Sequence, residues 1–373
     1  MPELLSCPGC AGPLKNEGGA LRCSCGAWPV VEGIPLLVPW ALNRQFTVEE
    51  VLARHLPPPP GAVGRLLRRL FPGIGAIRDS LHGRDASFME LASLLMRPFE
   101  LDYFRYRFSD LSYLASAAML TPLSRGPVLD LGCGAGHLTG AVFRRIPKAL
   151  VVGIDINFPL LYLAKRFVEP EAMYLCANAA GRLPFVDGAF EAAVCADMFK
   201  YLSDRGGAAR ELLRVTRGPV ILSHFFDPSF REDGIAPIEP EACAALFSAR
   251  SPRLYKESDI LGNFLRKREL DLGAPGASTS DVASLTAGVD PRLYAGADYF
   301  VAGETINPIY ETREEGDRIH LTRRVLSERH TAAFRAHPEL LPETLTLTRE
   351  QVVNRDPELV RQFVLLELPP NYL

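Results

Sequence analysis

The sequence predicts an α/β protein built on a mostly parallel sheet with helices on both faces. From residue 126 onward, apolar segments of strand length alternate with segments of helical periodicity. The strand segments are apolar almost throughout, as expected of strands that are buried on both faces. The chain has 373 residues, of which 47% are hydrophobic and 23% charged, a composition typical of a globular protein with a sizeable core.

The predicted strands and helices follow one another in regular order. Strands are predicted at residues 127–132, 149–156, 172–178, 190–198 and 219–226, and helices at 137–146, 159–167 and 206–216. Further along, residues 257–270 have helical periodicity and residues 297–303 are typical of a closing strand. Strands separated by helices in this way form a parallel sheet.

Composition and charge exclude several classes of protein. The formal net charge is −3, so no overall basic field is present to hold a polyanion. The longest apolar segments, such as residues 149–156, are far shorter than the ~20 residues that span a bilayer, and the first ten residues lack the pattern of a signal peptide. We therefore expect a cytoplasmic protein with no membrane span. The sequence does not determine the oligomeric state, and a homo-oligomer is one of the expected possibilities.

A glycine-rich loop follows the first predicted strand. In PVLDLGCGAGHLTG, residues 127–140, glycines stand at positions 132, 134 and 136 after Asp130. The dinucleotide pattern G-x-G-x-x-G would need a glycine in place of His137, and no Gly-Lys-Ser/Thr follows to make a P-loop. The loop instead matches D-x-G-x-G-x-G. With this motif the chain resembles the class I S-adenosylmethionine-dependent methyltransferases, from about residue 100 to about residue 305.

This resemblance implies a Rossmann-like fold with a mostly parallel, seven-stranded sheet, and S-adenosylmethionine as the methyl donor. The zwitterionic tail of that ligand needs close approach to the backbone and a carboxylate for its ammonium group. The loop residues Gly132, Cys133, Gly134 and Gly136 would allow the approach. Asp130, at the carboxyl end of the first strand, would attract the ammonium.

The next two strands carry the expected adenosine contacts. By resemblance, Asp155 accepts hydrogen bonds from both ribose hydroxyls, and Ile156 lies beside the adenine. Residues 176–197 resemble the family segment D-A-x-x-L-P-F-x-D-x-x-F-D, with Asn178 and Ala179 at its start. Asn178 replaces the usual acid, and its amide oxygen would still accept the bond from the adenine amine. The spacing from Asn178 to Pro184 departs from the family pattern by one additional residue.

Candidate groups for removing a proton from the acceptor lie near the strand ends. Asp197 follows the fourth strand and His224 lies at the end of the fifth, with Tyr201 and Asp227 as neighbours. A phenol or hydroxyl acceptor benefits from a general base, whereas an easily ionised amine needs none. For His224, a hydrogen-bonded packing role is the alternative.

Four of the eight cysteines lie within the first 25 residues. Cys7, Cys10, Cys23 and Cys25 follow the pattern C-x2-C-x12-C-x-C, and four thiolates from two short turns suit tetrahedral Zn²⁺. Free thiols or a redox pair are the alternative. Of the other four cysteines, those in or beside predicted strands are expected to be buried, inert thiols.

The stretch CSCGAWPVVEGIPLLVP resembles the Trm112-like zinc-ribbon family, and the resemblance covers residues 4–39. It implies a structural zinc with no open coordination position for a substrate. In that family the ribbon often partners methyltransferases. Here it would be fused to one, with residues 33–42 docking on the catalytic domain.

The remaining organisation is predicted from local composition. We expect a zinc ribbon at residues 1–40, a helical linker or lid at 41–125, the methyltransferase core at 126–304 and a C-terminal extension at 305–373. The linker contains a proline stretch at 56–61, a short basic turn at 65–71 and a helical pattern at 88–104 that Pro98 interrupts. The extension contains a hairpin at 307–324 whose turn is EEGD. The aromatic residues of the linker cover an apolar acceptor or pack in the core: Phe99, Tyr103, Phe104 and Tyr106.

The predicted function is methyl transfer to a small-molecule acceptor, of the kind found in secondary metabolism. Methylation of rRNA or tRNA is the main alternative. The rRNA enzymes with an N-terminal zinc module use a histidine ligand that this module lacks. Exocyclic-amine enzymes carry [DNS]-P-P-[YF], where this chain has ADMF at 196–199, and cytosine-5 enzymes need a Pro-Cys pair, where Val194 precedes Cys195. A non-catalytic binding partner that keeps the fold is a further alternative.

Overall fold

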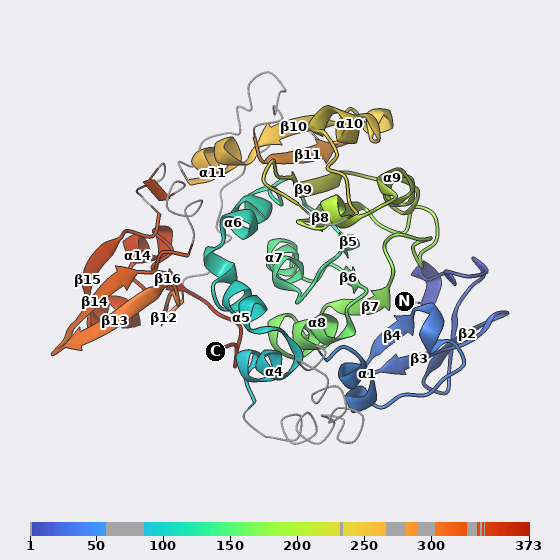
Figure 1. Cartoon of the computed structure of the whole chain (residues 1–373), viewed down its shortest axis with the longest axis horizontal. Coiled ribbons are helices and arrows are strands. Elements are labelled where there is room, and N and C mark those ends of the chain that lie inside the picture. The colour runs from blue at the N-terminus through green and yellow to red at the C-terminus, as the bar shows by residue number, and fades with distance from the viewer. Residues whose placement is uncertain are drawn as a thin grey trace.

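One large sheet runs through the computed structural model, which describes residues 2–56, 86–231, 234–265, 281–289, 303–326 and 334–373 except 336, 337 and 339. Its eleven strands in the described part of the chain have the order β1-β2-β3-β4-β7-β6-β5-β8-β9-β11-β10 (Figure 1). The stretch from β4 to β9 is parallel, and both ends are antiparallel. The predicted parallel central sheet is confirmed. The strand count differs from the expected seven because N-terminal strands extend the same sheet.

The core elements match the predicted alternation between residues 127 and 226. The strands are β5 (Val128–Leu131), β6 (Val151–Asp155), β7 (Met173–Ala177), β8 (Ala192–Ala196), β9 (Val220–Phe226), β10 (Arg253–Lys256) and β11 (Ala283–Ala287). The helices are α6 (Leu111–Ala118), α7 (His137–Arg145), α8 (Phe158–Leu163, continued by a π turn at Ala164–Val168), α9 (Arg205–Val215), α10 (Pro240–Ala245) and α11 (Glu257–Leu265). Strands β10 and β11 were not predicted. The strand expected at 297–303 falls, except for its last residue, outside the described part of the chain.

Alternate residues of each central strand face opposite sides of the sheet. In β5, Val128 packs into the hydrophobic core that α6, α7 and α8 cover, whereas Leu129 and Leu131 pack into the core that α9 and α10 cover. Asp130 shares the parity of Val128, so its carboxyl group lies on the α7 side. The period of two in the strand thus decides which face receives the polar residue.

The N-terminal cysteine-rich unit is part of the sheet. Its strands are β1 (Lys15–Glu17), β2 (Ala20–Cys23), β3 (Gly26–Val31) and β4 (Ile34–Leu37), followed by α1 (Val48–Arg54). Strand β4 pairs in parallel with β7, with Leu36 opposite Cys176 and Leu37 opposite Ala177. Residues 33–42 therefore dock on the core as expected, through backbone hydrogen bonds of a shared sheet.

Two helices join this unit to the core, α4 (Phe88–Leu95) and α5 (Pro98–Arg105). A capping box between Ser87 and Glu90 begins α4. Pro98 occupies the first turn of α5, where a missing backbone N–H is tolerated, so the predicted helix at 88–104 is divided there. Short 3-10 turns lie at Pro2–Leu4, Pro39–Ala41, Arg107–Ser109, Phe199–Tyr201 and Ser248–Arg250. Apart from Leu56, the proline stretch and the basic turn at 65–71 lie outside the described residues.

The C-terminal extension forms a separate small lobe and then returns to the core (Figure 1). Its elements are β12 (Thr305–Ile306), β13 (Tyr310–Glu315), β14 (Arg318–Arg323), β15 (Thr344–Thr348), α13 (Arg349–Val353), α14 (Pro357–Arg361) and β16 (Leu365–Leu366). The predicted hairpin is present as β13 and β14, and Glu315 pairs with Arg318 across a turn in which Gly316 has a φ of +65°. None of the helices in the described ranges has the length and apolar character needed to cross a bilayer.

The shared sheet makes a prediction about stability. Leu36 is fully buried in β4, so Leu36→Ala should lower the free energy of unfolding by about 2–5 kcal/mol, measured by urea denaturation. The matched control is Val353→Ala at an exposed helix position, which should change it by less than about 0.5 kcal/mol. If the two substitutions lowered the free energy of unfolding equally, a structural role for the pairing of β4 with β7 would be contradicted.

Candidate functional site

The glycine loop lies between β5 and α7, at the carboxyl edge of the parallel strands. Gly132, Gly134 and Gly136 have φ values of +72°, +52° and +78°, in the left-handed region that other residues disfavour. A Cβ atom at Gly136 would lie 2.7 Å from the Cβ of Ala164, whereas one at Gly134 would meet no heavy atom within 4 Å. Gly136 therefore permits close packing of the chain, and Gly134 borders open space that a ligand can approach.

A cavity of about 470 Å³ opens beside this loop. One wall comes from the core and contains Asp130, the loop and the residues that follow β8. The facing wall comes from α5 and the turn after it. The lining residues are Glu100, Tyr103, Phe104, Arg107, Asp130, Gly132, Cys133, Gly134, Ala135, His137, Leu138, Leu160, Ala196, Asp197, Met198 and Tyr201. A position at the carboxyl ends of the strands is the usual one for ligands in open α/β sheets.

Asp130 is the buried acid of this cavity, with 1% of its surface exposed. The Thr139 hydroxyl donates a hydrogen bond of 2.6 Å to its carboxylate. Burial raises the pKa of Asp130 to about 7, with a smaller contribution from the nearby Asp155 and against the opposing effects of the Thr139 hydrogen bond and Arg107. A cation bound in the cavity would favour the ionised carboxylate.

Asp155 connects the end of β6 to the glycine loop. One carboxylate oxygen accepts a hydrogen bond of 3.0 Å from the Gly134 N–H, and the other accepts one of 2.8 Å from the Asn157 N–H. Burial raises the pKa of the Asp155 carboxyl, although these donors act in the opposite direction. Asp155 thus holds the loop in shape, and its own side chain is not part of the cavity wall.

The other expected adenosine contacts lie on neighbouring strand ends. Ile156 is 55% exposed, Asn178 is exposed and Ala179 is half-buried. The Asn178 side-chain oxygen accepts a hydrogen bond of 2.9 Å from the Ala180 N–H. The structure therefore places Asp130, Gly132, Cys133, Gly134, Asp197 and Tyr201 around the cavity, and leaves Gly136, Asp155, Ile156, Asn178, Ala179 and His224 out of its wall.

Asp197, which directly follows β8, is a second acid of the cavity wall. Its φ is +57°, an uncommon conformation for a residue other than glycine. Its carboxylate lies 2.5 Å from Lys200 Nζ and 3.9 Å from His224 Nε2. Tyr201 is 46% exposed, and its ring meets that of Phe230 edge-on at 5.0 Å. Asp197 is therefore a carboxyl group of the cavity wall that lies against Lys200 and near His224.

His224 lies behind Asp197 and is buried, with a φ of +51°. Its Nδ1 is 2.5 Å from Glu257 Oε2, and its Nε2 is 3.7 Å from Asp227 Oδ2. Its backbone N–H donates to the Ser284 hydroxyl. Sequence reasoning missed Glu257, because the two residues are 33 positions apart and no motif marks the pair.

Sequence reasoning also missed the charged residues of the facing wall, Glu100 and Arg107. Arg107 is buried, donates a hydrogen bond of 2.9 Å to the Ser112 hydroxyl and lies 4.9 Å from the centre of the Tyr103 ring. Of the aromatic residues named for a lid, Tyr103 and Phe104 line the cavity. Tyr106 is half-buried outside the cavity wall, and the Phe99 side chain lies outside the described part of the structure.

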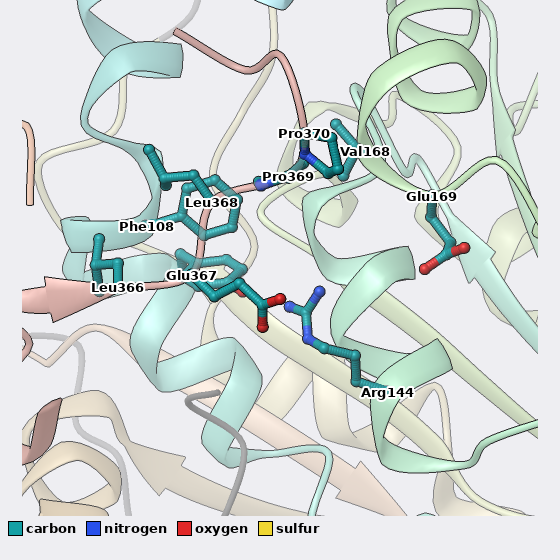
Figure 2. A pocket seen from close by; sticks show the side chains of 10 residues that line it. Phe108, Arg144, Val168, Glu169, Leu366, Glu367, Leu368, Pro369 and Pro370 are labelled. Carbon is teal, nitrogen blue, oxygen red and sulfur yellow. The ribbon is translucent and has the colours of Figure 1, made fainter. Parts of the chain in front are cut away.

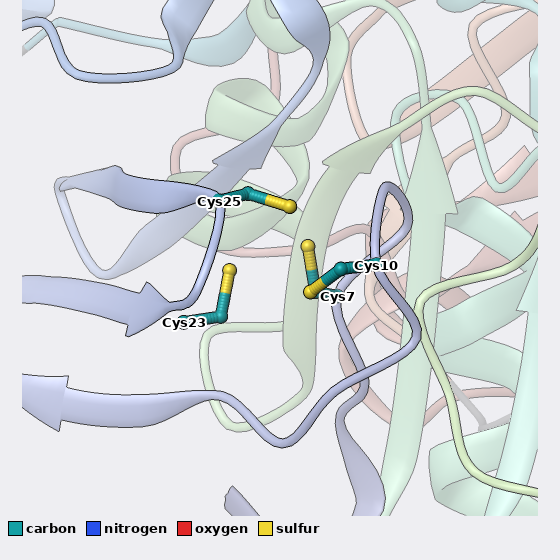
Figure 3. A group of neighbouring side chains, drawn as sticks. All are labelled: Cys7, Cys10, Cys23 and Cys25. Carbon is teal, nitrogen blue, oxygen red and sulfur yellow. The ribbon is translucent and has the colours of Figure 1, made fainter.

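The four N-terminal cysteines converge on one point, as Figure 3 shows. Their sulfur atoms all lie within 4.8 Å of one another, and a tetrahedral zinc with Zn–S distances of about 2.3 Å would separate them by about 3.8 Å. The Gly9 N–H lies 3.4 Å from Cys7 Sγ and the Ser24 hydroxyl 3.3 Å from Cys10 Sγ. The donor set and its hydrogen bonds therefore fit a structural zinc ion.

The four cysteines outside this cluster are buried free thiols: Cys133, Cys176, Cys195 and Cys243. Burial raises the pKa of each of these thiols. A raised thiol pKa makes the reactive thiolate scarce. The expectation of inert thiols in the strands agrees with these surroundings.

The core matches a known family model. Residues 129–222 fit the model described as "Methyltransferase domain". Over this stretch the core of the chain is similar to methyltransferase domains. The match begins in β5 and ends in β9, and it includes the glycine loop, Asp155 and Asp197.

The relatives that match this part of the chain are named for different methyl acceptors. A demethylmenaquinone methyltransferase from Thermus thermophilus is 42% identical over 91 residues, which are 24% of this chain and 41% of the relative. A trans-aconitate 2-methyltransferase from Azoarcus sp. is 28% identical over 212 residues, covering 52% of this chain and 82% of the relative. The chain thus spans about two fifths of the length of the Thermus relative.

Among solved structures, the sugar N-methyltransferase KedS8 from Streptoalloteichus sp. is 14% identical with a TM-score of 0.37. The similarity covers 52% of this chain and 94% of that one. A TM-score this low adds nothing to what the sheet topology shows.

The buried acid of the methyltransferase domain makes a prediction about pH. In the role expected for it, Asp130 would have to lose its proton to pair with the ammonium group of S-adenosylhomocysteine, the demethylated product of the expected methyl donor. Because its pKa is raised to about 7, affinity should fall up to about tenfold for each pH unit from 7 down to 5. Calorimetric titration across this range measures the effect. Asp130→Asn should bind S-adenosylhomocysteine more weakly, with an affinity that does not change over this pH range. If the affinity of the wild type also did not change over this range, the pairing would be refuted.

Proposed function

We propose that the protein transfers a methyl group from S-adenosylmethionine to a small-molecule acceptor in the 470 Å³ cavity. The observation that carries this proposal is the composition of the cavity wall. The glycine loop and Asp130 line the same cavity as Asp197 and Tyr201. A donor held by the first pair and an acceptor held by the second would meet within one enclosed space.

The donor side provides contacts for a zwitterionic ligand. Asp130 is a buried carboxylate for the ammonium group, and Gly134 leaves its surroundings open for backbone approach. We propose that Asp155 turns one oxygen toward the ribose when the ligand is bound, with Ile156 against the adenine and Asn178 at its amine. The exposed side chains of Ile156 and Asn178 support these roles, because both are accessible to a ligand.

S-adenosylmethionine supplies an electrophilic methyl group on its sulfonium sulfur. A lone pair of the acceptor forms the new bond to the methyl carbon while the carbon–sulfur bond breaks, and S-adenosylhomocysteine leaves. Asp197 is the proposed base for an acceptor that must lose a proton. Lys200, 2.5 Å away, would orient the Asp197 carboxyl group, and His224, oriented by Glu257, would act through Asp197. Tyr201, at the exposed edge of the cavity, would contact the acceptor.

Two observations favour a small-molecule acceptor. The relatives described above are named for demethylmenaquinone and trans-aconitate, both of which are small molecules. The net charge of −3 offers no general attraction to nucleic acid. An acceptor from secondary metabolism stays a prediction, and so do the rRNA or tRNA and non-catalytic alternatives, since no contact in the described residues favours them.

We also propose that the N-terminal unit is a Trm112-like ribbon with one structural zinc on Cys7, Cys10, Cys23 and Cys25. The convergence of the four sulfur atoms supports it. The four clustered cysteines and the four buried thiols, none of them in a disulfide, support a reducing, cytoplasmic location. The division of the chain at residues 40, 125 and 304, and a homo-oligomeric state, stay proposals.

The cofactor assignment is tested by calorimetry with S-adenosylhomocysteine and, separately, NAD. The wild type should bind the first ligand and not the second. Asp155→Ala should reduce the affinity at least a hundredfold, because it removes the ribose acceptor and the group that holds the Gly134 N–H. Asp317→Ala, at an exposed hairpin turn, should bind like the wild type. Binding of NAD alone would overturn the proposal.

The metal proposal is tested by elemental analysis of the purified protein. We expect one zinc per chain, and its loss in Cys10→Ser, because three remaining thiolates hold zinc less tightly. Cys243→Ala removes a buried thiol far from the cluster and should keep the zinc. A well-folded wild type without zinc would refute the ribbon.

A further inference from the structure

The facing wall of the cavity has few contacts of its own with the sheet. Helix α5 and the turn Arg107–Ser109 contribute Glu100, Tyr103, Phe104 and Arg107 to the cavity. These residues precede the part of the chain that matches the methyltransferase family model. Between positions 100 and 105, Phe104 is the buried side chain. The wall therefore depends on whatever holds Phe104 in place.

Tyr372, in the C-terminal extension, holds Phe104 directly. The Tyr372 hydroxyl donates a hydrogen bond of 2.8 Å to the Phe104 carbonyl and lies 2.6 Å from Nε2 of His137. A hydroxyl has one hydrogen, so the second bond must use the Nε2–H of His137 as donor. Both partners of Tyr372 belong to residues that line the cavity, one in each wall.

The surroundings of Tyr372 keep this arrangement neutral and rigid. Its ring is 2% exposed and stacks on Phe88 with 4.5 Å between ring centres. Burial raises the pKa of the Tyr372 hydroxyl, which stays protonated as a donor. Burial, with Arg107 and Arg144 nearby, lowers the pKa of His137, which stays neutral. The neutral imidazole keeps one proton, on Nε2, for the bond to Tyr372.

The backbone of the same segment caps helix α4. The Phe88 N–H donates to the Asn371 carbonyl at 2.7 Å, and the Met89 N–H donates to the Tyr372 carbonyl at 3.1 Å. These are N–H groups of the first turn of α4, which has no intrahelical partners for them. The segment thus fixes α4, the stacked Phe88 and the wall behind them together.

A second connection lies at the other end of the wall. The Ser109 hydroxyl donates a hydrogen bond of 2.6 Å to the side-chain oxygen of Asn307. The Asn307 amide nitrogen donates to the Phe363 carbonyl, and its backbone N–H to the Val364 carbonyl. Both Ser109 and Asn307 are buried. The wall from Phe104 to Ser109 is therefore tied to the extension at both ends.

Between these anchors the chain is loosely packed. Residues 367–372, which we call the strap, follow β16 and include Pro369 and Pro370. Figure 2 shows this part of the chain beside Phe108, with the Glu367 and Arg144 side chains pointing toward each other. A cavity of about 200 Å³ lies under it. The middle of the strap leaves this space unfilled, and apart from Leu368, which packs against the core, its buried side chain is Tyr372.

We propose that the strap sets the shape of the S-adenosylmethionine pocket, with Tyr372 as a positioning residue that joins α5 to His137. The inference rests on the proposed function, because it concerns the binding of that ligand. Tyr372 does not line the cavity itself, so it acts through Phe104 and His137. Coupling is reciprocal: ligand in the cavity should hold the strap, and a detached strap should weaken the ligand.

The test compares two tyrosines of the same extension. Tyr372→Phe keeps the ring and removes the hydroxyl between the two walls. Tyr310→Phe removes the hydroxyl of another buried tyrosine, which donates to the Pro342 carbonyl; neither residue lines the cavity. We expect Tyr372→Phe to lower S-adenosylhomocysteine affinity about tenfold in calorimetry, and Tyr310→Phe to leave it unchanged. Thermal unfolding of both variants shows whether they lose similar stability.

Ser109→Ala removes the second connection and should weaken binding in the same direction. Hydrogen exchange provides a readout that a merely structural role would not move. In the wild type, the ligand should slow exchange of the Phe88 and Met89 amides about fivefold or more, and this protection should disappear in Tyr372→Phe.

The outcomes separate the two proposals. A wild type that does not bind S-adenosylhomocysteine overturns the proposed function, and with it the basis of the strap. A wild type that binds, with Tyr372→Phe and Ser109→Ala binding equally well and no ligand-dependent protection at α4, overturns the strap alone. Equal loss of affinity in Tyr372→Phe and Tyr310→Phe would also overturn it, because affinity would then follow general stability.

Discussion

Parallel pairing of β5 with β6 and β8 is the constraint on which the rest of the site depends. Parallel strands end at the same edge of a sheet, so the loops after β5, β6 and β8 must lie together. The hydrogen bond from the Gly134 N–H to the Asp155 carboxylate then joins two of these loops. Without that register, the glycine loop would have no fixed shape and the cavity no inner wall.

Several groups at this carboxyl edge of the sheet are energetically unfavourable. Asp130 is buried as a carboxyl group, and Asp197 and His224 hold backbone conformations that residues other than glycine rarely adopt. Such costs persist only where surrounding contacts enforce them. Here Thr139, Lys200 and Glu257 supply the compensating hydrogen bonds and charges.

The segments at the two ends of the described chain complete the domain in different ways. The N-terminal unit adds four strands to the sheet edge at β7, where backbone hydrogen bonds are available to any partner strand of correct register. The extension instead reaches the cavity wall through buried side chains, above all Tyr372 and Asn307. The first contributes to the stability of the sheet, and the second lies close enough to the cavity to influence its ligand.

The sequence by itself determined the alternation of strands and helices, the glycine loop, the acids at the strand ends and the clustered cysteines. These features depend on local periodicity or short spacing, which are visible along the chain. Only the tertiary structure decided that Asp155 binds the loop, that His224 lies behind Asp197 next to Glu257, and that Tyr372 meets His137 across 235 positions. Contacts of this kind carry no local signal, because the sheet order and the path of the extension bring the partners together. Burial, which sets the pKa of Asp130, is likewise a property of the folded chain.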